Sequence, residues 1–441
     1  MLRPMTESFP ERLPRQTIEE RQLVRLNALL EELKVSNPFW RERLTGVNGP
    51  LQSIKEISTL PFLTKNDLVQ DQLAHPPFGA NLTYPLTQYS RIHQTSGTTG
   101  KPLRWLDTPE SWSWMLDLWG QIYRLVGIRP DDRFAFPFSF GPFIGFWAAF
   151  EGAQRCGNLS LTMGGMSSEA RLKMIEELQA TIICCTPTYA LRLIDVAEQM
   201  GISLKDNSVR MLILAGEPGA AIPAIRERIQ SSWNARVIDH WGMTDIGSLG
   251  IESEHSPGEL IILETECIAE IIQQDGTEPV SPGEMGELVI TNLGRWGQPV
   301  IRYRTGDLVR AVTTASAEGI ELLRLQNGIL SRADDMVTIR GNNVFPTSVD
   351  ALLRQFQEIV EYRITVVTRR SMPHLVIEIE PASNAQVVSP KVGGAEDLLR
   401  RVGRAIKDRL NFQAEIVLAS NLPRFEMKGR RFFREEQAGL Q

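Results

Sequence analysis

Short apolar runs alternate with helical patterns between about residues 130 and 245, and this alternation limits the fold more than any other feature of the chain. Repeated strand–helix–strand units predict a largely parallel sheet that is covered on both faces. Ligands of such sheets lie beyond the carboxyl ends of the strands. We therefore expect three turns to meet at one edge of the sheet, namely CTPTY (185–189), AGEPG (215–219) and HWGMTD (240–245).

The regions on either side of residues 130–245 have different sequence patterns. The segment TIEERQLVRLNALLEELK predicts an amphipathic helix that begins at Thr17, since Thr17 and Glu20 have the spacing of a capping box. After residue 257, β-like runs with Gly and Pro between them predict a second, more antiparallel sheet region. From about residue 335 the pattern is that of a small α+β domain. The fold class that we expect is α/β, with a large domain of several sheets over residues 1–333 and a small domain over residues 334–441.

Composition excludes several classes of protein. The net charge of −6 gives no basic field for a nucleic acid or an anionic membrane. The uncharged run 134–150 is shorter than the ~18 residues of a membrane span and contains prolines, so we expect it to be buried. Four cysteines in 441 residues form no disulfide framework, and the N-terminus lacks the apolar centre of a secretory signal. A cytoplasmic protein that binds neither nucleic acid nor membrane fits these features.

The stretch HQTSGTTGKP, residues 93–102, concentrates small hydroxyl residues, glycines and one lysine. It is not a P-loop of the GxxxxGK[ST] type, because Gly97 and Gly100 are too close together. Glycines let backbone N–H groups approach an anion, and hydroxyl groups and Lys101 would add donors and charge. From its residues alone, the stretch is either a phosphate-binding loop or a polar turn.

Four segments, LPFLTKNDL (60–68), RIHQTSGTTGKP (91–102), CTPTYAL (185–191) and RGNNVFP (340–346), resemble the phenylacetate-CoA ligase family. That family belongs to the adenylate-forming superfamily, whose motifs six segments of the chain resemble in the same order. They are TSGTTGKP (95–102), AGEP (215–218), HWGMTD (240–245), IRYRTGDL (301–308), SRADDMVTIRGNNVFP (331–346) and LPRFEMKGR (422–430). The resemblance covers essentially the whole chain. It implies an acid–thiol ligase that uses ATP to convert a carboxylic acid into an acyl-AMP, with release of pyrophosphate, and then transfers the acyl group to a thiol. It also implies that the small C-terminal domain is mobile.

A nucleotide site follows from the same resemblance. Trp241 matches the aromatic residue that stacks on adenine, Asp307 matches the carboxylate that binds the ribose hydroxyls, and Arg332 matches a second ribose or phosphate ligand. Other readings are a core tryptophan, a turn aspartate and a surface ion pair, respectively. The other positions implied for ATP are Thr95, Ser96, Gly97, Thr98, Thr99, Gly100 and Lys101 around the β and γ phosphates, Gly216, Glu217 and Pro218 beside adenine, and His240, Gly242 and Met243 around Trp241.

The match of HWGMTD to the family implies catalytic roles for Thr244 and Asp245, with Asp245 also holding the magnesium ion. The family pattern has glutamate where this chain has Asp245, so the carboxylate is one methylene shorter and can bind Mg²⁺ through a water or more weakly. A structural zinc is not expected, because Glu252, His255 and Cys267 form a poor tetrahedral set.

The C-terminal motifs imply a catalytic lysine and a hinge. Lys428 matches the mobile lysine that bridges the carboxylate and the α-phosphate, although its arginine neighbours also fit a solvated surface. Asp334 matches the hinge between the two domains, and Gly341 could line a channel for pantetheine because it has no side chain.

The acyl pocket is the part that the sequence determines least. The implied positions offer aromatic faces and open glycines, which favours an aryl or arylalkyl acid over a long fatty chain. Each phenylalanine among them can equally be a core residue. The positions are Phe136, Phe140, Gly141, Gly164, Gly165 and Ala215.

The acceptor stays open at this point. CoA or the phosphopantetheine of an acyl carrier protein fits the first hypothesis. An amide ligase that transfers the acyl group to an amine is the alternative, as is a relative that binds ATP or an acyl ligand without catalysis. A homodimer is possible by analogy with the family.

Overall fold

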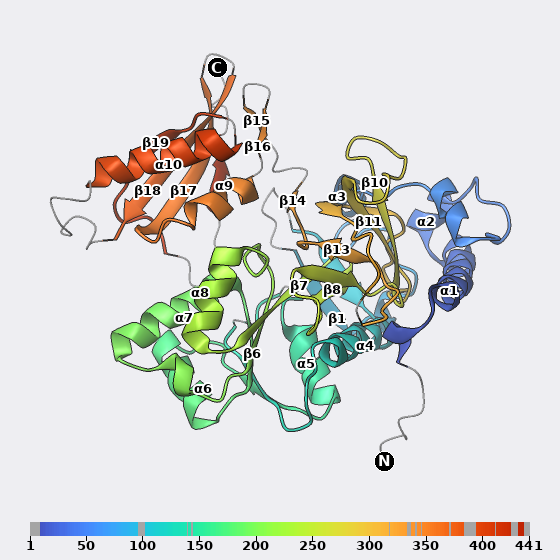
Figure 1. Cartoon of the computed structure of the whole chain (residues 1–441). Coiled ribbons are helices and arrows are strands. Elements are labelled where there is room, and N and C mark those ends of the chain that lie inside the picture. Colours follow the sequence, from blue (N-terminus) through green and yellow to red (C-terminus); the bar gives the residue numbers. More distant parts are fainter. Residues whose placement is uncertain are drawn as a thin grey trace.

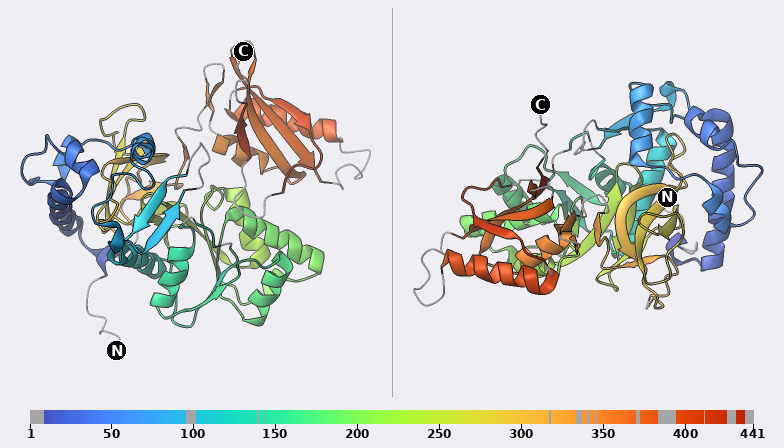
Figure 2. Two further views of the ribbon diagram at one scale, coloured as in Figure 1. Left: turned by 180° about the vertical axis from the view of Figure 1, so that it is seen from behind. Right: turned by 90° about the horizontal axis from the view of Figure 1, so that it is seen from above.

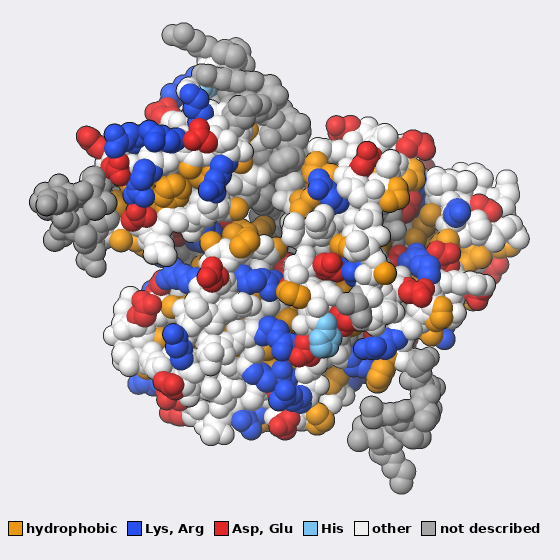
Figure 3. Space-filling model, in the orientation of Figure 1, with side chains coloured by type: hydrophobic (Ala, Val, Ile, Leu, Met, Phe, Trp, Pro, Cys, Tyr) orange, Lys and Arg blue, Asp and Glu red, His pale blue; other side chains and the backbone are white. Residues whose placement is uncertain are grey.

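The structure is a computed structural model of the whole chain. It describes residues 9–95, 102–138, 140–142, 144–316, 318–332, 337–339, 342–344, 346–369, 372–382, 394–410, 412–424 and 431–435. A large body built around two sheets carries a smaller C-terminal body on one side (Figures 1 and 2). On the face in Figure 3, acidic and basic side chains are interspersed.

The parallel sheet predicted from the alternating pattern is confirmed. Within the described residues, the large sheet has the strand order β13-β9-β8-β7-β6-β5-β3-β4. Strands β3 to β7 pair in parallel, while β8, β9 and β13 extend the sheet in antiparallel fashion. Their bounds are β3 (Arg133–Phe136), β4 (Leu159–Thr162), β5 (Ile182–Cys185), β6 (Met211–Leu214), β7 (Arg236–Met243), β8 (Gly247–Glu252), β9 (Glu259–Ile262) and β13 (Arg324–Gln326).

Helices cover both faces of this sheet. On one face, α6 (Ser168–Glu177), α7 (Pro187–Met200) and α8 (Pro223–Trp233) bury the alternate residues Ile183, Leu212 and Val237 of the strands. On the other face, α4 (Pro109–Leu125) and α5 (Trp147–Arg155) cover Cys184, Ile213 and Ile238. The strands are apolar throughout because both of their faces are buried.

Helix starts in this domain follow a common local rule. At α7, Thr186 is the N-cap and accepts a hydrogen bond from the Tyr189 amide at 3.2 Å, while Pro187 occupies the first helical position. At α4, Thr108 and Pro109 act in the same way. Proline suits this position because its missing N–H has no partner there in any helix.

The N-terminal helix α1 (Arg15–Ser36) is present, but the predicted capping box is wrong. The helix begins two residues before Thr17, directly after Pro14, and has no side-chain cap. Pro14 cannot continue a helix towards the N-terminus, so it sets the start. The short helices α2 (Pro38–Arg43) and α3 (Lys65–Ala74) follow, with 3₁₀ turns at Pro10–Arg12, Ile54–Thr59, Leu86–Gln88 and Leu204–Asp206 along the chain.

The second, antiparallel sheet predicted after residue 257 is confirmed. It has the order β10-β11-β12-β14 among the described strands, with β10 (Cys267–Ile272), β11 (Met285–Asn292), β12 (Tyr303–Arg310) and β14 (Ser331–Arg332). A separate hairpin of β1 (Arg91–Gln94) and β2 (Arg104–Asp107) flanks the predicted phosphate loop. The loop's residues 96–101 lie outside the described residues.

The C-terminal body is a small α+β unit with its own apolar core. Its described sheet has the order β19-β18-β17-β20, and a short hairpin precedes it. The elements are β15 (Val337–Ile339), β16 (Asn342–Val344), α9 (Pro346–Leu353), β17 (Ile359–Arg369), β18 (Met372–Pro381), α10 (Ala395–Leu410), β19 (Glu415–Leu418) and β20 (Phe432–Arg434). The boundary predicted at residues 333 and 334 falls outside the described residues.

The cysteines all lie in described segments and are free, with Cys156 exposed and the other three buried. None of the described helices combines the length and the apolar composition needed to cross a membrane.

Candidate nucleotide and acyl site

Three turns follow neighbouring strands at the carboxyl edge of the large sheet, as predicted. Cys185 at the end of β5 is opposite Leu214 of β6, and Leu214 is opposite Asp239 of β7. The Ala215 amide donates to the Cys185 carbonyl at 3.1 Å, so the turns after β5 and β6 start side by side. The turn after β7 begins one strand further along the same edge.

Trp241, Asp307 and Arg332 converge, although they are far apart in the sequence. The indole Nε1 of Trp241 donates to Asp307 Oδ2 at 2.9 Å, and Arg332 Nη1 lies 3.2 Å from Asp307 Oδ1. Arg332 also donates to the Thr305 carbonyl at 3.0 Å, which fixes it against β12. Asp307 and Arg332 are register partners on β12 and β14. This cluster brings together the aromatic, carboxylate and guanidinium groups that the sequence predicts for a nucleotide site.

Asp245 is buried in the turn between β7 and β8. Its Oδ2 accepts a hydrogen bond from the Tyr303 hydroxyl at 3.3 Å, whereas no described residue hydrogen-bonds to its Oδ1. Burial raises the pKa of this carboxyl group, and the charge of Lys65 opposes the rise. A buried oxygen without a protein partner is a feature that a hard cation or its bound water satisfies, so this donor fits Mg²⁺.

Arg295 is a site residue that sequence reasoning missed. It lies in the loop between β11 and β12, wholly buried, and its Nη1 donates to the Thr244 carbonyl at 2.6 Å. Tyr303, which contacts Asp245, was missed as well. For Arg295, the sequence gives a weak signal, because this arginine is the only charged residue between positions 292 and 301. No pattern in the sequence points to Tyr303.

Glu217 lies in the turn after β6 and contacts the first turn of α7. Its Oε1 accepts a hydrogen bond from the Thr188 amide at 2.7 Å. Gly216 has φ of +92°, a backbone conformation that other residues rarely adopt. Pro218 is exposed next to it. The role of these residues at adenine stays a prediction.

The predicted acyl pocket divides into a core part and an open part. Phe136 is fully buried between Phe134 and Phe150, so core packing takes up its aromatic faces. Phe140 is partly exposed, and a Cβ atom on Gly164 would lie 3.7 Å from its ring.

Gly165 is exposed and has φ of +76°. No described atom lies within 4 Å of where a Cβ atom on Gly165 would stand. The Gly141 carbonyl accepts a hydrogen bond from Trp147 Nε1 at 3.1 Å, which orients the segment that carries Phe140. Ala215 is nearly buried, at 8% exposure, in the turn after β6.

His240 behaves as a core histidine in this structure. Its ring stacks on Trp119 of α4 with centroids 4.8 Å apart, and neither ring nitrogen has a hydrogen-bond partner among the described residues. Burial lowers its pKa to about 3, so the ring is neutral. Gly242 and Met243 belong to the end of β7, and a Cβ atom on Gly242 would lie 2.7 Å from the Gly247 carbonyl oxygen of β8.

Several predicted site residues lie outside the described residues. They are Ser96, Gly97, Thr98, Thr99, Gly100, Lys101, Asp334, Gly341 and Lys428. The base of the phosphate motif is described: the Thr95 amide donates to the Leu103 carbonyl at 2.9 Å, and the Leu103 amide donates to Thr95 Oγ1 at 3.0 Å.

Two of the three residues weighed as zinc ligands, Glu252 and Cys267, have other partners. Glu252 pairs with Arg226 at 2.6 Å, and Cys267 Sγ lies 3.4 Å from the Leu263 carbonyl oxygen. Across the described ranges, no three His, Cys, Asp or Glu side chains gather as a metal site.

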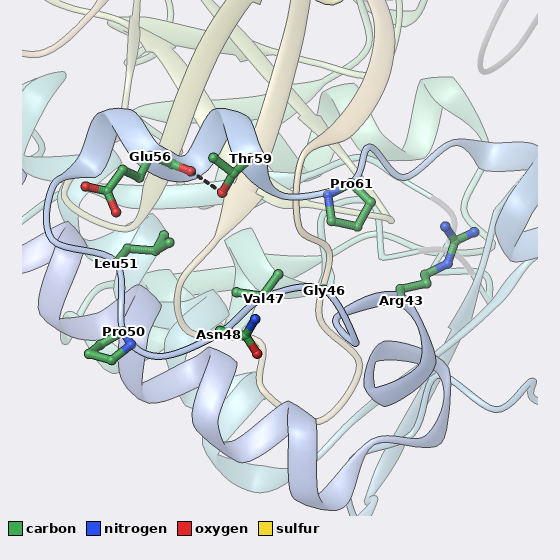
Figure 4. Close-up of a pocket in the computed structure, with 9 residues that line it drawn as sticks. All are labelled: Arg43, Gly46, Val47, Asn48, Pro50, Leu51, Glu56, Thr59 and Pro61. Carbon is green, nitrogen blue, oxygen red and sulfur yellow. Dashed lines mark hydrogen bonds between the residues drawn. The ribbon is translucent and has the colours of Figure 1, made fainter.

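A hollow of about 430 Å³ lies elsewhere, next to α2 (Figure 4). Arg43, Val47 and Pro61 are among its lining residues, and no predicted site residue lines it. It therefore has no part in the site.

Comparison with known proteins agrees with this geometry. The family model of AMP-binding enzymes matches residues 86–294, and the model of their C-terminal domain matches residues 341–435. The phenylacetate-coenzyme A ligase of Aromatoleum evansii is 30% identical over 378 residues, which cover 83% of this chain and 82% of that enzyme. The phenylacetate-coenzyme A ligase of Thermus thermophilus is 28% identical over 424 residues, or 92% of this chain and 94% of that enzyme.

Solved structures of 2-hydroxyisobutyryl-CoA ligase are similar over 99% of the chain and 94% of that enzyme, at 26% sequence identity. The postadenylation state with 2-HIB-AMP gives a TM-score of 0.90, whereas the thioesterification state with 2-HIB-AMP and CoA gives 0.73. The present arrangement is thus closer to the former. Sequence, fold and site agree: the chain belongs to the AMP-binding enzymes and, among them, to the phenylacetate-CoA ligase family.

Proposed function

We propose that this enzyme converts an aryl or arylalkyl carboxylic acid into its CoA thioester in two steps. In the first step, a carboxylate oxygen bonds to the α-phosphorus of ATP and pyrophosphate leaves. In the second step, the sulfur of CoA bonds to the acyl carbon and AMP leaves. The observation that carries this proposal is the cluster of Trp241, Asp307 and Arg332, in a chain whose relatives are AMP-forming acid–CoA ligases.

Electrostatic screening is the main task of the first step, because both reactants are anions. Asp245 would hold Mg²⁺, which would screen the charge of the phosphates when bound. Asp307 would accept the ribose hydroxyl groups, and Arg332 would contribute positive charge beside it. Lys428 would bridge the carboxylate and the α-phosphate, and the loop 95–101 would hold the β and γ phosphates.

The second step would require a movement of the C-terminal domain about Asp334. That movement would remove Lys428 and bring in the segment around Gly341 to form the thiol channel. Two sequential reactions would then share one site. The relation to both the postadenylation and the thioesterification states of 2-hydroxyisobutyryl-CoA ligase supports this proposal.

The aromatic acid is supported by the open part of the acyl pocket. Phe140 is partly exposed and would provide an aromatic face, and the exposed Gly164 and Gly165 would add no side chains to the pocket. An aromatic ring packs on such a face in an offset or edge-on arrangement, which favours an aryl acid over a long flexible chain.

The test is pyrophosphate release from ATP and magnesium with benzoic, hydroxybenzoic, aminobenzoic, phenylacetic, cinnamic and medium-chain acids, each with and without CoA. We expect release with an aromatic acid and formation of its thioester with CoA. Formation of the acyl-adenylate without formation of the CoA thioester would show that CoA is not the acceptor. A carrier protein or an amine would then take its place. ATP binding without release for any acid would contradict the proposed activity.

A further inference from the structure

Arg295 and Asp107 form an ion pair at the centre of the large domain. Both side chains have 0% exposure, and two parallel hydrogen bonds of 2.8 Å join the guanidinium to the carboxylate. The guanidinium carbon also lies 4.9 Å from the centroid of the Trp105 ring. Charged side chains are rarely buried so completely, so the pair requires an explanation beyond packing.

The two residues belong to the segments that frame the nucleotide site. Asp107 ends β2, and the β1–β2 hairpin carries the phosphate motif at its turn. Arg295 uses its remaining nitrogen, Nη1, to donate to the Thr244 carbonyl at 2.6 Å, and the Asp245 carbonyl oxygen lies 3.4 Å from the same atom. The Arg295 guanidinium therefore connects the β1–β2 hairpin to the turn that contains Asp245.

Stability alone does not account for this arrangement. A buried ion pair pays a large desolvation cost, and well-packed apolar residues of the same volume are often as stable or more so. The pair does fix the orientation of the Arg295 side chain relative to its partners, because a planar guanidinium makes several hydrogen bonds in a rigid fork. Among the described residues, the carboxylate of Asp245 accepts only a long hydrogen bond from Tyr303, at 3.3 Å, so the anchoring of its backbone helps to decide where the carboxylate lies.

We propose that Arg295 is a positioning residue for the magnesium–ATP complex. Through Asp107 and the Thr244–Asp245 backbone, it would hold the β1–β2 hairpin and the turn of Asp245 in a fixed relation, so that Asp245 is placed to hold the divalent cation of a bound ATP. The inference rests on the proposed function, because it assumes that the site binds ATP with a divalent cation.

The test compares two double substitutions that each remove a bidentate arginine–aspartate pair without leaving an unpaired charge. One is Asp107→Asn with Arg295→Gln. The matched control is Asp132→Asn with Arg210→Gln, a pair in which Asp132 also has little exposure. That control pair precedes β3 and β6, at the opposite end of the strands from the site.

The readout is binding of Mn²⁺ in the presence of ATP and without acid, measured by electron paramagnetic resonance, together with the apparent affinity for ATP in the absence of metal. We expect the Asp107/Arg295 variant to bind Mn²⁺ with ATP about tenfold more weakly, which is the effect of losing one charge-assisted hydrogen bond to a buried group. Affinity for metal-free ATP should change much less, and the control variant should match the wild type in both.

Should the double variant unfold, Arg295→Lys serves the same purpose. A lysine keeps the charge for Asp107 but lacks the fork that reaches both partners, so we expect weaker Mn²⁺ binding in that variant too. Equal Mn²⁺ binding by folded variant and wild type overturns the inference while leaving the proposed function intact. If the wild type forms no metal–ATP complex, the inference and the proposed function are both overturned.

Discussion

Asp307 shows how a single carboxylate can prepare a site before any ligand arrives. The Trp241 indole and the Arg332 guanidinium both point to its oxygens, at 2.9 and 3.2 Å. These bonds hold the aromatic ring and the positive charge at fixed positions around an acceptor. Preorganised groups of this kind cost little reorganisation when the substrate binds.

Lys428 is the residue whose role depends most on resemblance, since it lies outside the described residues. We expect Lys428→Ala to slow adenylation by ~10²- to 10³-fold, because a lost electrostatic donor typically has that effect. Thioester formation from a supplied acyl-adenylate should persist, because that step would not use the lysine. Both rates are measurable separately, by pyrophosphate release and by thioester formation. An equal loss in both would show that Lys428 has been assigned the wrong role.

Gly164 provides a direct test of the acyl pocket. A side chain at this position would extend from a point 3.7 Å from the Phe140 ring. We expect Gly164→Val to raise the KM for the aromatic acid by about tenfold, as the loss of ~1.4 kcal/mol of binding does. The KM for ATP should stay unchanged. A change in the KM for ATP with no change for the acid would place the acyl group elsewhere.

Strand β7 is the element on which most of the site depends, and its sequence RVIDHWGM combines core and site residues. Trp241 faces Asp307, His240 stacks on Trp119, and Asp239 lies beside Glu252 of β8. Burial first, and then the charge of Glu252, raises the pKa of Asp239 to about 7. A strand that packs ionisable groups this closely makes the stability of the domain depend on pH.

The sign of that dependence follows from proton binding. Between the ordinary pKa of 3.8 and about 7, the folded state holds a proton on Asp239 that the unfolded state has released. Stability is therefore lost as pH rises through this window. We expect Asp239→Asn to remove this contribution. Between pH 5 and pH 8, the Tm of the wild type should therefore fall more than the Tm of the variant. Thermal unfolding at four pH values measures it, and parallel curves would contradict the raised pKa.

Elements with a strong period were predictable from the sequence, and contacts between distant elements were not. The parallel strands and helices of residues 130–245 follow from their apolar runs, and the carboxyl edge follows from their order. Helix α4 was missed, although Thr108 and Pro109 form a clear start signal. Arg295 could not be found, because its meaning depends on Asp107 and Thr244, which are 188 and 51 residues away in the chain.

In the candidate site, too, the residue types were predictable from the sequence, whereas their surroundings were not. Trp241, Asp307 and Arg332 were predicted separately by resemblance, and the structure brings them together. Phe136 was predicted to line the pocket but is fully enclosed by aromatic neighbours. An alternating strand has one residue in two on each face, and sequence alone does not tell how much of that face neighbouring helices cover.

The C-terminal body lies beside helices α7 and α8 of the large body (Figure 1). Arg431, directly before β20, pairs with Glu361 of β17 at 2.6 and 3.0 Å, and its Nη1 lies 3.5 Å from Thr188 Oγ1 on α7. Ala351 of α9 packs against the apolar cluster under α7 and α8. The contact lies close to Lys428 in the chain and to Glu217 in space, because Glu217 bonds to the Thr188 amide.

This contact is expected to favour one of two arrangements of the domains. The present arrangement is closer to the postadenylation state of 2-hydroxyisobutyryl-CoA ligase than to its thioesterification state. A rotation of the C-terminal domain would separate Arg431 from Thr188. A contact present in one arrangement alone shifts the balance by no more than its own free energy, which is about 1 kcal/mol for one hydrogen bond.

Thr188→Val therefore should lower the rate of adenylation by about fivefold at saturating ATP, since 1 kcal/mol corresponds to that factor. Thioester formation from a supplied acyl-adenylate should not slow, because the contact is absent from that arrangement. Thr188→Ser keeps the hydroxyl group and should restore adenylation, which separates the hydrogen bond from the packing of the methyl group. If serine and valine slow adenylation equally, the hydroxyl contact to Arg431 does not contribute to the orientation of the C-terminal domain.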